Sequence, residues 1–340
     1  MKEFAIINQS TATVYSSTEK TRIDPKTGYV LSNIADKGLY GNLCRVIGEK
    51  DGMIKIMSHY GYIGFISPEN LIFLSREEKD TWLGSNLMVV TARCLDVMTA
   101  PKVQGNIIAS LPGGALVGTY ENEPVNDGWL RVKLPDGTDG YVTAVHLGPK
   151  LYGEDYLDAD PDVMEEMQLH AIERRMNAAG GKPGFSLQKV LDEHFDGSEE
   201  RFREALVRTA RSYLGVQYRW GGRSTFGIDC SGLVSMSYLL NGISIYRDAS
   251  IVTGHVLKRL EMDWDENGHF LLNNLDKMLP GDALYFPGHV AMYLGDGKYI
   301  HSTGKAGANG VVINSLIPGA KDFRRDLLEC FYAVGGVRLE

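Results

Sequence analysis

Apolar and polar residues alternate in short runs over the first 150 residues, which is the pattern of half-buried β-strands. Two stretches repeat one order of features: Asp-Gly, an alternating strand, a turn, Gly-Tyr and a second strand. They run from Asp51 to Ile66 and from Asp127 to Val145, and each follows an earlier alternating segment. The repeat predicts two small, mostly antiparallel β-barrels, at residues 1–75 and 86–150.

Beyond residue 150 the apolar residues recur at helical spacing. An acidic start and a stop at Gly180–Gly181 predict a connecting helix, so residues 151–195 are assigned to a helical linker. A second helix is expected to begin at Ser198 and to end at Gly215. The remaining chain, residues 196–340, then predicts a compact α+β domain with helices first and strands late.

The late strands include "DALYFPGHVAMYLGDGKYIHSTG", in which two alternating runs meet at Gly295–Gly297. A three-residue loop there sets Ala291 opposite His301. His289 and His301 then share one face of the hairpin as diagonal neighbours, about 7 Å apart between Cβ atoms. A two-residue loop would place them on opposite faces, so the interpretation depends on loop length.

A cysteine lies where the glycine-rich stretch "GGRSTFGIDCSGLV" changes to helical spacing. Asp229 is expected near the N-cap and Cys230 in the first turn, where the positive end of the helix favours a thiolate. Taken alone, a cysteine of this kind is more often a small buried thiol that only packs. The pair of histidines favours a catalytic cysteine instead. In this interpretation His289 takes the thiol proton, and His301 holds His289 in the required orientation.

Tyr218 precedes the cysteine in "YRWGGRSTFG". Its phenol is a candidate donor to the oxyanion of an acyl-transfer reaction, together with backbone N–H groups near Cys230. A tyrosine packed on a turn explains the same residue without chemistry. Both interpretations stay open at the level of the sequence.

The charge of the chain and its first residues limit the expected partners and the expected location. The 340-residue chain has a formal net charge of −8 and no block of Lys or Arg. Because nucleic acids and anionic lipids bind basic surfaces, we expect neither nucleic acid nor membrane as a partner. The first residues lack a secretory signal pattern, so we expect a cytoplasmic protein; a leader already removed would make it exported or periplasmic.

Cysteine and histidine spacing gives no sign of a metal site. The four cysteines, at positions 44, 94, 230 and 330, lack C-x-x-C spacing, and none of the eight histidines lies in an H-E-x-x-H motif. We therefore expect no metal, no disulfide framework and no organic cofactor.

Three segments together resemble the NlpC/P60 family of papain-like cell-wall peptidases: "QYRWGGRSTFGIDCSGLV", "LPGDALYF" and "HVAMYLGDGKYIHS". The resemblance implies an α+β fold in which the helix of Cys230 packs on an antiparallel sheet carrying the histidines. It also implies two bacterial SH3-like barrels before this domain. By the same likeness Cys230 is the nucleophile and His289 the base. His301 is the third polar residue, and Tyr218 lies on the oxyanion side.

Within the family, the architecture is similar to that of γ-D-glutamyl-L-diamino acid endopeptidases, which cleave murein peptides. This likeness implies that Asp229, Ser231 and Asp248 line the substrate pocket, and we assign Arg223 to the same set. An SH3 module would block one end of the cleft, so that only peptides with a free N-terminal L-Ala fit. A carboxylate cluster suits such an ammonium group, although Asp229 is also a candidate N-cap.

The sequence thus predicts a monomeric cysteine peptidase that cleaves L-Ala-γ-D-Glu-diamino acid peptides in cell-wall peptide recycling. One alternative is a wall-anchored D,L-endopeptidase acting on intact peptidoglycan. Another is an amidase or acyltransferase on the same thiol scaffold. A binding protein with an inactive peptidase domain is a third alternative, which the intact Cys230, His289 and His301 disfavour.

Overall fold

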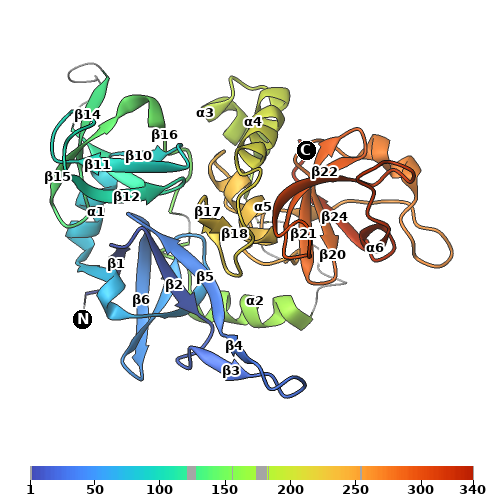
Figure 1. Cartoon of the computed structure of the whole chain (residues 1–340), viewed down its shortest axis with the longest axis horizontal. Helices are drawn as coiled ribbons and strands as arrows, with labels where there is room; N and C mark the ends of the chain where they lie inside the picture. Colours follow the sequence, from blue (N-terminus) through green and yellow to red (C-terminus); the bar gives the residue numbers. More distant parts are fainter. Residues whose placement is uncertain are drawn as a thin grey trace. The chain divides into compact units, whose positions relative to one another are not determined.

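The computed structural model describes residues 2–120, 128–154, 156–173, 182, 184–252 and 255–339 (Figure 1). Contacts divide the chain into two compact units. The first unit is Met1–Lys150, Glu154–Met164 and Trp220–Phe226, and the second is Leu151–Gly153, Glu165–Arg219 and Gly227–Glu340. Trp220–Phe226 therefore groups with the first unit, although it lies inside the predicted α+β domain.

The first unit holds two antiparallel seven-stranded sheets. The strands of the first sheet are β1 (Phe4–Ile7), β2 (Thr11–Tyr15), β5 (Ile34–Leu39), β6 (Leu43–Lys50), β7 (Met53–Ser58), β8 (Ile63–Ile66) and β9 (Leu71–Leu74). Those of the second are β10 (Asn86–Val90), β11 (Cys94–Met98), β12 (Ile107–Pro112), β13 (Leu116–Thr119), β14 (Trp129–Lys133), β15 (Asp139–Thr143) and β16 (Leu147–Pro149). The 3-10 helices η1 (Pro68–Asn70) and η2 (Ala144–His146) precede the last strand of each.

Both sheets have the same strand order, which is β5-β2-β8-β7-β6-β1-β9 in the first and β12-β11-β15-β14-β13-β10-β16 in the second. The repeated sequence forms the equivalent hairpins β7–β8 and β14–β15, so the repeat correctly predicted two β modules. Among the described residues, only the first module carries an inserted hairpin, β3 (Thr21–Ile23) and β4 (Val30–Ser32). Asp127, at the start of the second repeat, lies outside the described residues.

Helix α1 (Arg76–Gly84) connects the two modules and was not predicted. Its signal is a capping box: Ser75 accepts from the Glu78 backbone N–H, and the Glu78 carboxylate accepts from that of Ser75. The Trp82 indole N–H on this helix donates to the Gly41 carbonyl at 3.1 Å. Tyr40 of the first module joins the apolar core of the second. The two modules therefore share buried contacts.

The residues predicted to be catalytic lie in the second unit, which carries most of the remaining helices. Helix α2 (Pro161–Glu173) precedes α3 (Leu187–His194), α4 (Glu199–Ser212), α5 (Cys230–Leu239) and α6 (Arg325–Leu328); the short η3 spans Leu272–Lys277. The Ser198 hydroxyl caps α4, as predicted. The stop predicted for α2 at Gly180–Gly181 lies outside the described residues.

A six-stranded antiparallel sheet has the order β19-β24-β20-β21-β22-β23. Its strands are β19 (Lys258–Arg259), β20 (Ala283–Phe286), β21 (His289–Gly295), β22 (Lys298–Thr303), β23 (Gly310–Ser315) and β24 (Ala333–Gly336); β17 (Arg223–Ser224) and β18 (Gly227–Ile228) are two-residue strands outside it. Helix α5 packs against β21, β22 and α4, and every one of its residues is buried. The predicted α+β fold, with the cysteine helix on the histidine sheet, is confirmed.

The loop between β21 and β22 differs from the predicted three-residue connection. The turn has two residues, Asp296 and Gly297, with φ of 50° and 69°, values typical of a type I′ hairpin turn. Leu294 forms a bulge, because Tyr293 faces Tyr299 while Gly295 faces Lys298. The extra residue restores the register, so the two histidines still share a face.

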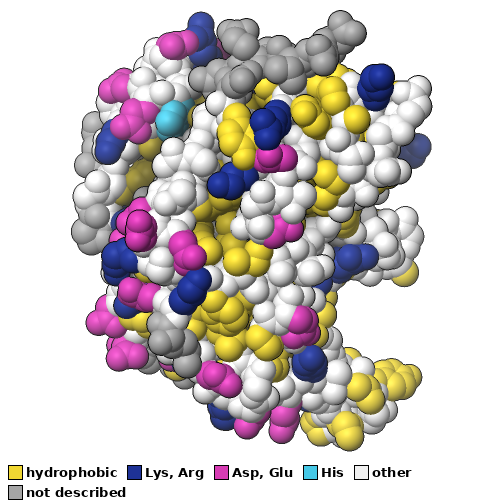
Figure 2. Space-filling view, turned by 90° about the vertical axis from the view of Figure 1, so that its left-hand side faces the viewer, with side chains coloured by type: hydrophobic (Ala, Val, Ile, Leu, Met, Phe, Trp, Pro, Cys, Tyr) yellow, Lys and Arg dark blue, Asp and Glu magenta, His cyan; other side chains and the backbone are white. Residues whose placement is uncertain are grey.

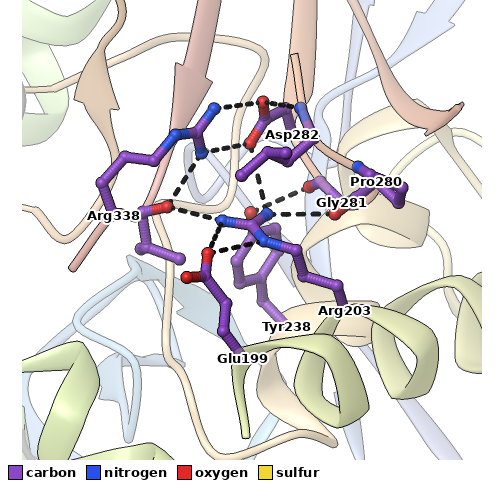
Figure 3. Close-up of polar contacts among 9 residues, drawn as sticks. Glu199, Arg203, Tyr238, Pro280, Gly281, Asp282 and Arg338 are labelled. Carbon is purple, nitrogen blue, oxygen red and sulfur yellow. Dashed lines mark hydrogen bonds and ion pairs between the residues drawn. The ribbon is translucent and has the colours of Figure 1, made fainter. Parts of the chain in front are cut away.

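A buried ionic network ties the second unit together (Figure 3). Asp282 is fully buried and accepts two hydrogen bonds from Arg338, at 2.7 and 2.6 Å. Arg203 on α4 lies 3.5 Å from the same carboxylate. The Tyr238 hydroxyl, on the cysteine helix, donates to the neighbouring Gly281 carbonyl at 2.8 Å. The network therefore joins α4 and α5 to the chain that enters β20.

Figure 2 shows one face of the molecule, on which hydrophobic side chains gather along the middle. Lys, Arg, Asp and Glu side chains are mixed around them, and neither charge forms a continuous patch on the described part of this face. Among the described helices, none is long and apolar enough to cross a membrane.

We predict that Asp282→Asn destabilises the protein by about 3–5 kcal/mol, because it leaves two guanidinium groups facing a neutral amide in the interior. Urea unfolding followed by tryptophan fluorescence measures the loss. Asp263→Asn is the matched control, since Asp263 pairs with Lys277 at the surface and should cost far less. Equal losses in the two variants would contradict the prediction.

Candidate active site

Cys230 is the first residue of α5, as the sequence predicted. The Asp229 carboxylate caps the helix by accepting from the Gly232 backbone N–H at 2.7 Å. At this position, backbone N–H groups are not used by the helix ladder and the helix dipole is positive. The cysteine therefore lies where a developing negative charge is stabilised.

Burial opposes the thiolate that the helix start favours. Burial, and then the Asp229 carboxylate, raise the pKa of Cys230 to about 12. The backbone N–H groups of Val290 and Ser231 and the charge of Arg247 act in the opposite direction and do not compensate. Because Val290 follows His289 on β21, its hydrogen bond also places the sulfur beside the histidine strand.

His289 and His301 are hydrogen-bonded to each other. His289 Nε2 lies 2.7 Å from His301 Nδ1, with the rings nearly perpendicular. His301 is fully buried, and its Nε2 lies 2.9 Å from Asn314 Oδ1 on β23. The structure thus brings together the two histidines predicted to share a face and adds Asn314, which the sequence analysis missed.

Both imidazoles are neutral near pH 7. Burial, and then His301 and Arg324, lower the pKa of His289 to about 3. Burial lowers the pKa of His301 to about 4, although its hydrogen bond to Asn314 acts in the opposite direction. A neutral imidazole next to a protonated thiol is the form in which His289 acts as a general base.

Tyr218 lies close to the sulfur in a half-buried position. Burial, followed by the proximity of Cys230 and Asp229, raises the pKa of its phenol. The phenol therefore keeps its proton and remains a hydrogen-bond donor, which the predicted oxyanion role requires.

Asp229 is held by Arg247, a residue missed in the sequence. Arg247 is 1% exposed and donates to both carboxylate oxygens, at 3.1 and 3.0 Å, and to the Ser231 hydroxyl at 2.5 Å. The Asp229 carboxylate therefore caps the helix and pairs with Arg247, and its predicted contact with a substrate ammonium group stays a prediction. The signal available in the sequence was a carboxylate directly before the predicted nucleophile and an arginine downstream in "YRD".

The other two predicted substrate residues lie in different surroundings. Asp248 follows Arg247 directly and is half-buried. Arg223 belongs to the first unit, where it is 2% exposed, stacks 3.8 Å above the Tyr60 ring and lies 3.9 Å from the Asp36 carboxylate. Tyr60 donates to Asp36 as well. Arg223 is thus part of a buried cluster with residues of the first β module.

Comparisons with known proteins identify this arrangement. The model of the NlpC/P60 family matches residues 215–318. The chain is 32% identical over 308 residues to dipeptidyl-peptidase 6 of Lysinibacillus sphaericus, a match that covers 90% of this chain and 93% of that protein. The chain belongs to the NlpC/P60 family. This NlpC/P60 protein is a cysteine peptidase. Cys230, His289 and His301 all lie within the matched residues.

Two further relatives of this NlpC/P60 peptidase differ in how much they cover. It is 37% identical over 113 residues to the gamma-D-glutamyl-L-lysine dipeptidyl-peptidase of Bacillus subtilis (strain 168), over 30% of this chain and 33% of that protein. The crystal structure of an NlpC/P60 family protein from Bacillus cereus ATCC 10987 aligns with a TM-score of 0.61 and 20% identity. That alignment covers 98% of this chain and 99% of the other, so the fold is shared over both β modules.

No group of three or more His, Cys, Asp or Glu side chains that could hold a metal ion occurs among the described residues. The groups that the site offers are a thiol, a pair of imidazoles and backbone N–H donors. These groups suit acyl transfer through a thioester.

We predict that alkylation of Cys230 by iodoacetamide rises steadily from pH 7 to pH 10, about tenfold per unit, because only the thiolate reacts and its pKa is raised. Mass spectrometry of the Cys230 peptide gives the rate, and the exposed Cys94 of the same chain is the internal control. A rate that stays flat between pH 5 and pH 8 would instead indicate a thiolate–imidazolium pair.

Proposed function

We propose that this enzyme is a dipeptidyl-peptidase that hydrolyses the γ-D-glutamyl-diamino acid bond of murein peptides. The observation that carries the proposal is the match to dipeptidyl-peptidase 6 over 93% of that protein's length. Such a match includes the two β modules as well as the peptidase domain. The named activity of the shorter B. subtilis match, on γ-D-glutamyl-L-lysine bonds, supports the same bond type.

The site geometry supports a two-step reaction. The Cys230 sulfur attacks the γ-carbonyl carbon while His289 accepts the thiol proton, and a tetrahedral oxyanion forms. His289 then gives this proton to the leaving amine of the diamino acid, and the C–N bond breaks to leave a thioester. Water attacks the thioester with His289 as base, which releases the carboxylate and regenerates the thiol.

The oxyanion would lie at the start of α5, with the Tyr218 hydroxyl as a second donor. Substrate contacts are assigned to Asp229, Ser231 and Asp248; Asp229 also caps the helix start and is held by Arg247. A free N-terminal L-Ala is the proposed specificity element, since an ammonium group pairs with carboxylates. We further propose a monomer that acts in peptide recycling, and its cytoplasmic location stays a prediction.

The test compares hydrolysis of L-Ala-γ-D-Glu-meso-diaminopimelate with that of the same peptide acylated at alanine. We expect cleavage of the free peptide and at least a hundredfold lower kcat/KM for the acylated one, because the acyl group removes the charge and adds bulk. Liquid chromatography with mass spectrometry identifies the released dipeptide. Cys230→Ala is the blank.

Other outcomes assign other activities. Equal cleavage of both peptides would indicate an endopeptidase that accepts intact wall. Cleavage of neither peptide, with Cys230 still alkylated by iodoacetamide, would favour the amidase, acyltransferase or binding alternatives.

A further inference from the structure

We propose that Asn314 is a positioning residue that fixes the tautomer of His289 through His301. The proposal rests on the role of His289 as the base in the proposed function. Asn314 lies on β23 and hydrogen-bonds to His301. We infer that it determines which ring nitrogen of His289 has the lone pair that accepts the thiol proton.

The orientation of the Asn314 amide follows from its second partner. Asn314 Nδ2 lies 2.8 Å from the backbone carbonyl of Asp322, which also accepts from the Ser315 N–H at 3.1 Å. A carbonyl only accepts hydrogen bonds, so the NH2 group of Asn314 must face it. The Asn314 Oδ1 therefore faces His301 Nε2, at 2.9 Å.

The orientation of Asn314 then sets both imidazole tautomers. Because Oδ1 only accepts, His301 must carry its proton on Nε2, which leaves a lone pair on His301 Nδ1. His289 Nε2, 2.7 Å away, must then be the donor. The lone pair of neutral His289 is left on Nδ1, which is the atom free to accept the thiol proton. The Asp322 backbone carbonyl thus determines the donor and acceptor of each hydrogen bond from Asn314 through His301 to His289.

Contacts of the sheet hold Asn314 and the Asp322 carbonyl in place. Asn314 faces Tyr299 across β22–β23, which makes it a diagonal neighbour of His301 on the same face. Lys298 on β22 forms an ion pair with the Asp322 carboxylate, at 2.8 and 2.9 Å, and so secures the segment whose carbonyl orients Asn314. These contacts keep the amide in one orientation.

A neutral side chain at position 314 also suits the charges around the histidines. The Arg324 guanidinium lowers the pKa of both imidazoles, and Asp326 raises that of His301. An amide accepts the His301 hydrogen bond without adding charge. A carboxylate would accept the same bond but would favour protonated imidazoles, which are poor bases.

The first test is Asn314→Leu, followed by long-range 1H–15N NMR of the histidine side chains in the full-length enzyme at pH 7. In the wild type we expect His301 and His289 both protonated at Nε2. In the variant we expect a mixture of tautomers, with kcat about 10- to 100-fold lower and KM unchanged. The wild-type pattern retained in the variant, or His301 protonated at Nδ1 in the wild type, would overturn the proposal.

Asn314→Asp and Asn274→Leu separate positioning from structure. Asn314→Asp loses the hydrogen bond to the Asp322 carbonyl, but its carboxylate still accepts from His301 Nε2. It should therefore keep the tautomers and move the acid limb of kcat/KM to higher pH, since a raised pKa protonates the base at higher pH. Asn274 is fully buried and hydrogen-bonds to the Asp263 backbone away from the histidines. Asn274→Leu should lower stability and leave the tautomers intact; a tautomer change there would count against a specific role for Asn314.

The tautomer signals do not depend on the substrate. If the enzyme cleaves no murein peptide, the proposed function fails while the NMR result still decides the role of Asn314. Conversely, unchanged tautomers in an active Asn314→Leu enzyme would reject the positioning role alone.

Discussion

The buried Asp282 carboxylate is the constraint on which the peptidase unit depends. Two guanidinium groups and the Leu279 N–H satisfy its oxygens, while its backbone carbonyl accepts from Tyr293 on β21. The same short segment receives the Tyr238 hydroxyl of the cysteine helix. The buried charge of Asp282, which must be neutralised, therefore holds the cysteine helix α5 next to the histidine strand β21.

Burial dominates the chemistry of the site. It raises the pKa of Cys230 and lowers the pKa of both histidines, so each group is neutral at rest. A helix start, which usually favours a thiolate, does not reverse this because Asp229 adds a negative charge next to the sulfur. In the proposed mechanism the thiol therefore gives its proton to His289 during the attack on the substrate, and no preformed ion pair is required.

The glycine-rich loop before Cys230 has a structural role in the first unit. Gly221, at φ +71°, leaves no room for a side chain, since a Cβ there would lie 2.5 Å from Ile34. The next loop residue with a large side chain, Arg223, is buried against Tyr60 and Asp36. Gly221 thus allows the loop to pack closely against the first β module.

The sequence by itself determined the elements with local causes. The β repeat, the caps at Ser198 and Asp229 and the start of the cysteine helix depend on residues a few positions apart. Tertiary structure decided what depends on distant residues: the bulge at Leu294 that preserved the register, the pairing of Arg247 with Asp229, the contact of Asn314 with His301, and the pKa of Cys230. These require knowledge of what becomes buried and what it meets there, because the cost of burying a charge or a polar group is set by partners far away in the chain.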